Sequence, residues 1–440
     1  MNILIIGSGA REHAIAKALH RSPQAPKIFC CGTSKNPGIK PLTENYWVGD
    51  IGRIDEVRTK AKEWNINIAI IGPEAPLEKG LADVLWQNSI PTIGPKQKLA
   101  QLESSKSFTR DLLTKYKINA SPLYGVFDDL LLAKRFITDL GENNYVIKAD
   151  GLMSGKGVKV AGDHLHSFEE AFQFCSEILA HQSKIVIEEK LIGQEFSLLC
   201  FCDGNSLIPM PLVQDHKRAF VNDEGPNTGG MGSYSDRDHS LPFLTEKDLH
   251  EATRINEAVL DALTFEFREP YIGILYGSFI ATKNGVRLIE YNARFGDPEA
   301  LNVLSILESD FLAICEAMVM GRLSRNLVSF ENFATVCKYA VPNGYPDHPE
   351  KNFEIDISAV HNKNNLYFGA VDERNGKLYA TGSRTIAVVG IADTIMDAEQ
   401  IAETEIQRIK GQLFHRKDIG TNELIKKRIQ HMQDLRACNV

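Results

Sequence analysis

The residues with the clearest chemical potential lie in one short stretch, LIEYNARFGDPE at positions 288–299. Glu290 and Asn292 are two positions apart, so on a β-strand their side chains point to the same face. A carboxylate and an amide oxygen on one face suit Mg²⁺, which prefers oxygen ligands and also binds substrate phosphates. Arg294 continues this alternation and could stabilise an anion that develops during phosphoryl or acyl transfer. The alternative is a strand–turn–helix junction with incidental polar residues, which the coincidence of metal-type ligands, an arginine and a glycine turn disfavours.

A second candidate is the glycine-rich segment KADGLMSGKGV at positions 148–158. Gly155 and Gly157 would let the main chain approach phosphate oxygens, and Lys148 and Lys156 would supply positive charge to them. The spacing is not that of a Walker A loop, and the segment returns as a strand rather than a helix. The alternative is a β-hairpin loop with surface lysines.

A third candidate is the acidic stretch IEEKL at positions 187–191. Alternation places Glu188 on the face opposite its neighbours, and Glu195 follows shortly after. Acidic residues here could bind ribose hydroxyls, while the main chain from Glu189 to Leu191 could contact an adenine edge. A solvated edge strand explains the pattern about equally well.

Two further segments combine charge with glycine. Asp215, Lys217 and Arg218 precede the loop GPNTGGMG at positions 225–232, a combination that resembles a cradle for an oxyanion or carboxylate; the alternative is a solvated turn. At the N-terminus, the GSGARE turn places main-chain N–H groups at a helix start, which favours an anion, although tight packing would also require it. Glu12 stands where a dinucleotide-binding fingerprint needs a small residue, so a nicotinamide enzyme is disfavoured.

Hydrophobic periodicity indicates the elements that would hold these residues. An apolar run at 2–6 and a helical pattern at 10–20 begin an alternation of strands and helices, which predicts a parallel sheet with covered faces. Between residues 145 and 202 the order is strand, loop, strand, helix (168–181) and strands, which is typical of a small lid. We therefore expect a mixed α/β and α+β multidomain fold.

Three helical patterns are long. We expect single helices over 98–116, 298–320 and 397–412. Together with the strand patterns they divide the chain into an N-terminal α/β domain and two further domains. The expected domains are 1–103, 104–326 with a lid inserted at about 123–190, and 327–440.

Composition excludes several classes of partner. The chain has 440 residues, is 43% hydrophobic and carries a net charge of −8 without a basic block, so nucleic acid and anionic membranes are not expected partners. No apolar stretch reaches the ~18–20 residues of a membrane span. The eight cysteines are scattered without a C-x-x-C pair, which predicts reduced thiols in a cytoplasmic protein rather than a zinc site or disulfides.

Taken together, these segments resemble the ATP-grasp superfamily and, within it, the phosphoribosylamine–glycine ligases. The likeness runs nearly end to end and includes GPEAPL at 72–77, QLESSK at 101–106 and RKDIG at 416–420. It implies an ATP-grasp fold with a Rossmann-like N-terminal domain and a C-terminal α+β domain. It also implies that the protein is a monomer and binds ATP together with Mg²⁺ or Mn²⁺. The nucleotide would lie between the lid and the central domain.

The resemblance also implies roles for individual residues. Lys106 and Lys148 would contact ATP phosphates, Glu188 and Glu195 would lie near the ribose, and Glu290 with Asn292 would hold the metal. Lys217, Arg218 and Arg294 would act on the glycine carboxylate and its acyl phosphate. The other implied substrate contacts are Gly9, Gly72, Pro73, Glu74, Asp215, Pro226, Asn227, Thr228, Gly229, Gly230, Asp297 and Pro298.

The implied reaction has two steps. A glycine carboxylate oxygen attacks the γ-phosphoryl group of ATP, and the amine of 5-phosphoribosylamine then displaces phosphate from glycyl phosphate, giving glycinamide ribonucleotide for purine biosynthesis. Two segments depart from the family pattern: GTSKNPGI at 32–39 only partly matches a P-G-N-A-G-T loop, and GSR at 382–384 replaces G-G-R. The alternatives are a sister ligase with another amine or amino acid and a non-catalytic nucleotide-binding relative, which retention of Lys148, Glu290, Asn292 and Arg294 disfavours.

Overall fold

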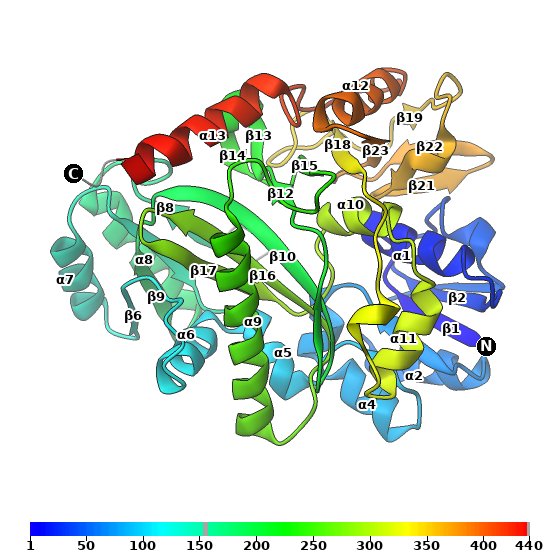
Figure 1. Cartoon of the computed structure of the whole chain (residues 1–440), viewed down its shortest axis with the longest axis horizontal. Coiled ribbons are helices and arrows are strands. Elements are labelled where there is room, and N and C mark those ends of the chain that lie inside the picture. Colours follow the sequence, from blue (N-terminus) through cyan, green and yellow to red (C-terminus); the bar gives the residue numbers. More distant parts are fainter. Residues whose placement is uncertain (153–156, 438–440) are drawn as a thin grey trace.

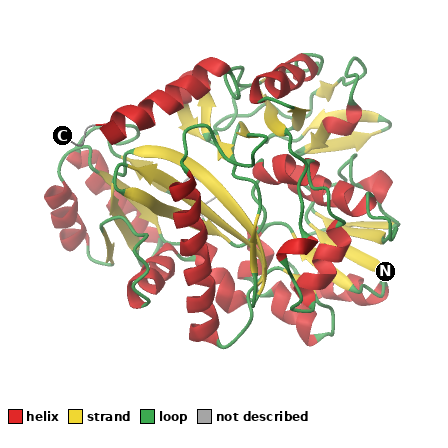
Figure 2. Cartoon of the chain, in the orientation of Figure 1, coloured by secondary structure: helices red, strands yellow, loops and turns green. Residues whose placement is uncertain are grey.

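The N-terminal part is a five-stranded parallel sheet covered by helices. The structure, a computed structural model, describes residues 1–152 and 157–437, and its sheet order is β3-β2-β1-β4-β5. Strands β1 and β4 are almost wholly apolar because helices cover both faces of the sheet (Figure 2). Ile3 and Ile5 pack on the α1 side, and Leu4 and Ile6 pack toward α2 and α4. The elements are β1 Asn2–Ile6, α1 Ala10–His20, β2 Lys27–Gly32, η1 Lys40–Leu42, β3 Asn45–Val48, α2 Ile54–Glu63, β4 Ile68–Ile71, α3 Glu74–Glu78, α4 Leu81–Gln87 and β5 Thr92–Ile93.

A small antiparallel sheet with its own core follows. Its order is β6-β9-β7-β8, and helices α7 and α8 pack together against it. This unit projects from one side of the molecule (Figure 1). Helix α8 begins where Ser167 accepts a hydrogen bond from the Glu170 N–H, and it has the bounds that the sequence predicts. The elements are β6 Tyr124–Phe127, α7 Leu130–Leu140, β7 Tyr145–Ala149, β8 Val158–Val160, α8 Phe168–His181 and β9 Ile185–Glu189.

The central sheet connects this lid-like unit to the N-terminal part. Its order is β11-β10-β16-β17, all neighbours being antiparallel, and α9 lies alongside it (Figure 1). A register shift between Ser278 and Phe279 determines which face of the sheet the last side chains of β17 point to. The elements are α5 Gln97–Ser104, α6 Lys106–Lys115, β10 Gly193–Asp203, β11 Leu207–Pro209, α9 Glu246–Phe267, β16 Ile272–Thr282 and β17 Gly285–Asn292.

The C-terminal part shares a sheet with the central part. The order β12-β15-β18-β23-β20 joins two strands from before residue 240 to three from after residue 330, and β24 pairs with β18. Helix α12 packs on this sheet, and α13 crosses toward the lid-like unit (Figure 1). The elements are β12 Gln214–Asp215, β13 Arg218–Phe220, η2 Val221–Asp223, β14 Glu224–Asn227, β15 Gly232–Ser235, α10 Glu299–Ser305, α11 Phe311–Val319, η3 Arg325–Leu327, β18 Ala334–Pro342, β19 Glu354–Ile355, η4 Lys363–Asn365, β20 Leu366–Phe368, β21 Val371–Arg374, β22 Lys377–Ala380, β23 Ile386–Ala392, α12 Ile395–Ile406, β24 Leu413–Phe414 and α13 Asn422–Ala437.

The three long helices are shorter than predicted. The pattern over 98–116 is divided at Ser105, which leaves the helical region and accepts a hydrogen bond from Phe108 N–H. The pattern over 298–320 is divided before Asp310, whose carboxylate accepts from Leu312 N–H to begin α11. Polar side chains that bind nearby N–H groups favour such breaks, and apolar periodicity alone does not register them. The third helix ends at Ile406, and Leu413–Phe414 joins the sheet instead. None of the described helices has the length and apolar character needed to cross a bilayer.

Candidate active site

Strand β17 presents the predicted metal ligands on one face. Glu290 and Asn292 are half-buried, whereas Tyr291 between them points into the core and donates a hydrogen bond to Asn256. The register shift lies between Ser278 and Phe279, so Ser278 pairs with Glu290 and the alternation is intact over the last three residues of β17. The two side chains therefore face the space between the central sheet and the lid-like unit.

The carboxylate of Glu290 lies in a strongly cationic environment. Burial alone would raise its pKa, but Lys217, then Lys148, Lys106 and Arg294, lower it. Lys217 Nζ lies 3.8 Å from Glu290 Oε1 and 3.9 Å from Glu195 Oε2. Burial would lower the pKa of Lys217, and Glu195 and Glu290 outweigh this and raise it. A cation-rich site around an ionised carboxylate is suited to a polyphosphate with a divalent ion.

The residues present fit a divalent cation that is bound mainly through phosphate and water. Glu290 is ionised, and among the residues that the structure describes its nearest cation, Lys217, lies beyond hydrogen-bond distance, so its oxygens can take a hard ion. Asn292 Oδ1 accepts a hydrogen bond from Arg294 Nη2 at 2.9 Å, which a metal would have to replace. Among residues 1–152 and 157–437, no group of three His, Cys, Asp or Glu side chains could hold a metal by itself.

Glu188 is part of a buried ion-pair cluster. Its carboxylate is buried, with 4% of the residue exposed, and it binds Arg110 Nε and Lys148 Nζ, each at 2.7 Å. Arg110 and Lys148 also donate to the Ile289 carbonyl, at 2.9 and 3.1 Å. Both cations therefore engage the Glu188 carboxylate in this structure, and its position near the ribose stays a prediction. Glu188 anchors Lys148 at the base of the glycine-rich segment, because an arginine 78 residues earlier in the chain completes a buried ion pair.

The remaining nucleotide candidates surround the same space. Lys106 Nζ donates to the Gly151 carbonyl at 2.9 Å, and Gly157 accepts from Ala149 N–H at 2.8 Å. Gly155 and Lys156 lie outside the described residues. Glu189 accepts a hydrogen bond from Leu123 N–H at 2.8 Å, which fixes the turn that leads to the half-buried Leu191. Glu195 is exposed and faces Lys217.

The loop at 225–232 folds back onto Asp215 and leaves no space for a side chain. Thr228 donates through both N–H and hydroxyl to the Lys217 carbonyl, at 2.7 and 2.8 Å. Gly230 has a φ of +111°, and a Cβ there would lie 2.6 Å from both Asp215 Oδ1 and Pro298 Cδ. Pro226 and Asn227 are the last two residues of β14, in which Asn227 pairs with Arg218. Gly229 and Gly230 thus present main chain, not side chains, to the site.

An arginine from the C-terminal part holds this loop. Arg384 Nη1 donates to the carbonyls of Gly229, Gly230 and Asp297, at 2.7, 3.3 and 2.6 Å. It also lies 3.2 Å from Asp297 Oδ1, which accepts from Tyr339 OH at 2.6 Å. The sequence marked the GSR segment only as a departure from the family pattern, so this role of Arg384 was missed. Nothing local in the sequence connects it to a loop about 150 residues away.

Arg294 bridges the metal face and the N-terminal part. Its guanidinium lies 2.9 Å from Glu103 and 3.6 Å from Glu74, and Ala293 N–H donates to Glu103 at 2.7 Å. Burial would lower the pKa of Arg294, but Glu103 and then Glu74 raise it. Its Nε is buried and has no hydrogen-bond partner among the described residues. Glu103 was missed, although it lies in the QLESSK motif.

Two N-terminal glycines, Gly9 and Gly72, accommodate the side chain that caps helix α1. Glu12 accepts from Gly9 N–H at 2.6 Å, and a Cβ at Gly72 would lie 2.0 Å from Glu12 Oε1. Glu12 therefore closes the start of α1 and requires glycine at position 72. Pro73 precedes α3, which begins at Glu74, so the turn at 72–74 lies beside Arg294.

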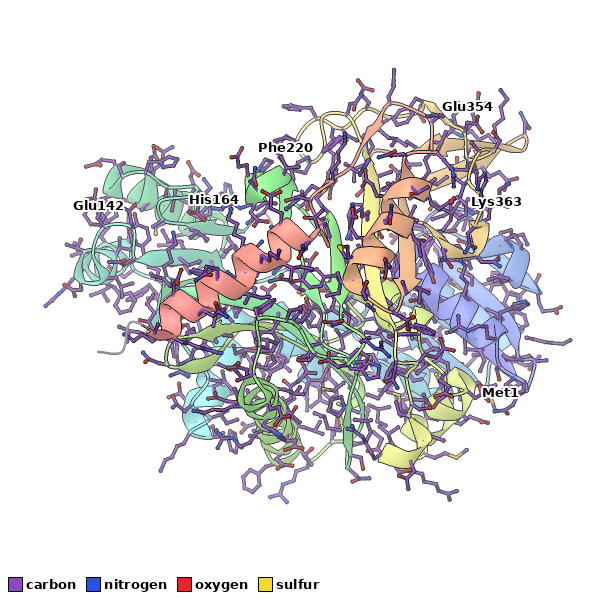
Figure 3. All side chains as sticks on the ribbon, turned by 45° about the horizontal axis from the view of Figure 1, so that its top comes forward. Met1, Glu142, His164, Phe220, Glu354 and Lys363 are labelled. Carbon is purple, nitrogen blue, oxygen red and sulfur yellow. The ribbon has the colours of Figure 1, made fainter. Side chains whose placement is uncertain are left out.

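Arg218 points away from Lys217. Its guanidinium binds Asp163 Oδ2 at 2.9 Å, His164 Nε2 at 3.0 Å and the Gly225 carbonyl at 2.7 Å. Lys217 and Arg218 diverge because consecutive residues of an extended chain face opposite sides, so the predicted role of Arg218 at the glycine carboxylate stays a prediction without support from these contacts. Arg218 instead joins the lid-like unit to the loop at 225–232, beside a cavity of about 480 Å³; Figure 3 labels His164 on the lid-like side.

Comparison with known proteins identifies the family. Three phosphoribosylglycinamide synthetase models match the chain: the N domain at 1–103, the ATP-grasp (A) domain at 104–300 and the C domain at 335–422. A phosphoribosylamine–glycine ligase of Methanosarcina barkeri is 48% identical over 437 residues, which is 99% of this chain and 100% of that protein. One of Methanocella arvoryzae is 46% identical over 438 residues, with 99% and 100% coverage.

Solved structures agree with this assignment. The phosphoribosylamine–glycine ligase of Thermotoga maritima has a TM-score of 0.80 and 26% identity, covering 95% of this chain and 100% of that one. A biotin carboxylase domain from Hydrogenobacter thermophilus, at 14% identity and a TM-score of 0.72 with 98% and 94% coverage, shares the fold alone. The α/β multidomain ATP-grasp fold predicted from the sequence is thus confirmed. By sequence over nearly its whole length and by structure, the chain belongs to the phosphoribosylglycinamide synthetase family.

Proposed function

We propose that this chain joins glycine to 5-phosphoribosylamine through glycyl phosphate, converting ATP to ADP and phosphate and yielding glycinamide ribonucleotide. The observation that carries the proposal is the half-buried, ionised Glu290, surrounded by Lys217, Lys148 and Lys106 at the end of β17. The similar curated proteins carry the same ligase name, so a sister ligase acting on another amine or amino acid is not favoured.

ATP would bind between the lid-like unit and the central sheet. Lys148 and Lys106 would neutralise its phosphates, and Glu195 would bind the ribose, while the main chain from Glu189 to Leu191 would contact the base. Glu290 and Asn292 would hold a divalent cation, with Mg²⁺ expected and Mn²⁺ as the alternative. When bound, that ion would neutralise the β- and γ-phosphates and orient them for transfer.

Glycine would lie beside Asp215 and the loop at 225–232. Burial and then Glu299 raise the pKa of Asp215 well above its usual range, while Lys217 and Arg384 oppose this. A bound ammonium group would offset the charge of these two acidic side chains. Gly230 lies so close to Asp215 and Pro298 that the loop can offer only main chain, and no side chain, to the amino acid at this point.

For phosphoryl and acyl transfer the chain needs mainly to position the substrates and to neutralise their negative charge. The glycine carboxylate oxygen bonds to the γ-phosphorus of ATP and the bond to ADP breaks, while Lys217 and Arg294 neutralise the developing negative charge. The neutral amine then attacks the acyl carbon, phosphate leaves, and the amine gives up a proton. The turn at 72–74 and the Gly9 turn would hold the phosphoribosylamine beside Arg294, near the acyl group.

Single-omission assays test the proposal. Purified enzyme would be given ATP with Mg²⁺, glycine and freshly prepared phosphoribosylamine, and phosphate release would be measured with each substrate omitted in turn. We expect turnover only in the complete mixture. Turnover with glycine but a different amine would favour a sister ligase, and no turnover with any pair would favour a non-catalytic relative.

A further inference from the structure

One carboxylate near the proposed phosphate site has no role in the reaction described above. Asp150 directly follows β7 and begins the glycine-rich segment. Its Oδ1 accepts from the N–H groups of Lys106 and Ser107, at 2.7 and 3.2 Å. The Ser107 hydroxyl donates to Oδ2, and the Ser105 hydroxyl lies 3.3 Å from Oδ1. Asp150 therefore caps α6 from a strand more than 40 residues away.

An acidic residue beside a polyphosphate site is unfavourable unless its charge is balanced. Here the first-turn N–H groups of the ten-residue helix α6 supply that balance. The contact is reciprocal, because Lys106 Nζ donates to the Gly151 carbonyl, the residue after Asp150. The start of the glycine-rich segment and the main chain of Lys106 are thus fixed to each other.

The same junction is also held from the opposite side. Glu103, at the end of α5, accepts from Ala293 N–H and pairs with Arg294. The five residues from 103 to 107 consequently connect the end of β17, which carries the proposed metal ligands, to the end of β7, which carries Lys148. The QLESSK motif therefore fixes the end of β17 relative to the end of β7.

We propose that Asp150 is a positioning residue for ATP, which sets Lys106 and the origin of the glycine-rich segment relative to Lys148. The proposal rests on the proposed function, because it takes Lys106 and Lys148 as the phosphate-binding lysines. Without the carboxylate, the start of α6 would lose a charged acceptor and Lys106 would sample more positions. ATP binding would weaken, whereas the glycine pocket, formed by other elements, would be unaffected.

The test compares Asp150→Asn with a matched control. Asp129 also caps a helix, α7, through Leu131 and Leu132 N–H at 2.7 and 2.9 Å, but α7 lies at the outer edge of the lid-like unit (Figure 1). We expect Asp150→Asn to raise the KM for ATP about tenfold, the effect of losing one charge-assisted interaction, with the KM for glycine unchanged. Asp129→Asn should leave both values unchanged. Binding of Mg·ADP, measured by calorimetry without turnover, should weaken in parallel.

Several outcomes would overturn the inference: a KM for ATP within twofold of wild type, an equal rise in both KM values, or an equal effect of Asp129→Asn. If Asp150→Asn does not fold, Ser107→Ala, which removes one donor to the same carboxylate, decides the question through a smaller rise in the KM for ATP. The proposed ligase function and the positioning role of Asp150 can fail separately. The dependence of wild-type turnover on glycine and ATP tests the ligase function alone, because it does not involve the Asp150 variant.

Discussion

Replacing Glu188 with glutamine should destabilise the protein strongly, because it leaves two buried cations without their shared anion. The side chains of Glu188, Arg110 and Lys148 are only 3–5% exposed, and both ion pairs measure 2.7 Å. Removing one partner of such a buried pair costs about 3–5 kcal/mol. Domains have total stabilities of only roughly 5–15 kcal/mol, so the lid-like unit should unfold at a clearly lower denaturant concentration.

The effect should depend on pH in a defined direction. Burial by itself would raise the pKa of Glu188, but Arg110 and then Lys148 lower it. A carboxyl group whose pKa is lowered on folding stabilises the protein above its unfolded pKa of about 4.3, and this contribution is lost as the pH falls through the folded pKa. The difference between wild type and Glu188→Gln should therefore be full at pH 7 and shrink in acid.

The turnover of Glu188→Gln should differ from that of the wild type mainly at alkaline pH. Burial lowers the pKa of Lys148, and Glu188 is the main group that opposes this. Without Glu188 the lysine should lose its proton at a lower pH, and phosphate binding requires the protonated form. The alkaline limb of the turnover profile of Glu188→Gln should accordingly move to lower pH, with the variant nearest to wild type under mildly acidic conditions.

The assay must report on the lid-like unit. All three tryptophans, Trp47, Trp64 and Trp86, lie in the first 103 residues, so unfolding should be followed by circular dichroism rather than by their fluorescence. Glu354→Gln is the control, since its 2.8 Å pair with Lys377 is exposed and should contribute little. Equal denaturation midpoints for Glu188→Gln and wild type at pH 7, together with an unshifted alkaline limb, would refute the reasoning.

Three further substitutions test the site. Glu290→Gln should reduce metal-dependent turnover by at least tenfold and weaken the response to Mg²⁺ titration; unchanged turnover would contradict the metal assignment. Gly230→Ala should raise the KM for glycine sharply, because the new Cβ would meet Asp215 at 2.6 Å and the φ of +111° disfavours alanine; an unaltered KM would place glycine elsewhere. Arg384→Ala should lower kcat about tenfold in steady-state assays, since it removes the Nη1 atom that contacts three main-chain carbonyls, and wild-type kcat would exclude a role in holding the loop.

Local sequence patterns predicted the parts of the site that depend on a single strand. The two-residue spacing of Glu290 and Asn292 places both on one face whatever surrounds them, because alternation follows from strand geometry. The continuous apolar runs in the first 103 residues similarly predicted a covered parallel sheet, and the structure has one. The bounds of α8 were also predicted, and the structure adds that Ser167 caps the start of the helix.

The partners of these residues could not be predicted in the same way. Glu188 has the spacing of a surface residue, yet Arg110, from a helix 78 residues earlier, makes it part of a buried ion pair. Arg384 reaches Gly229 from 155 residues away. The helix expected over 298–320 is interrupted because Asp310 caps a new helix, a choice between two local hydrogen-bonding patterns that packing decides.

The sequence by itself thus determined that a carboxylate and an amide share one face of β17, and through the family motifs that this face belongs to an ATP-dependent ligase. Only the tertiary structure decided which cations surround Glu290, that Glu188 is an anchor, and that Arg218 serves the lid-like unit while Lys217 serves the site. The physical reason is the distance along the chain over which each feature is determined. Side-chain direction along a strand is fixed by the backbone of neighbouring residues, whereas an ion pair needs groups that meet only when distant elements pack.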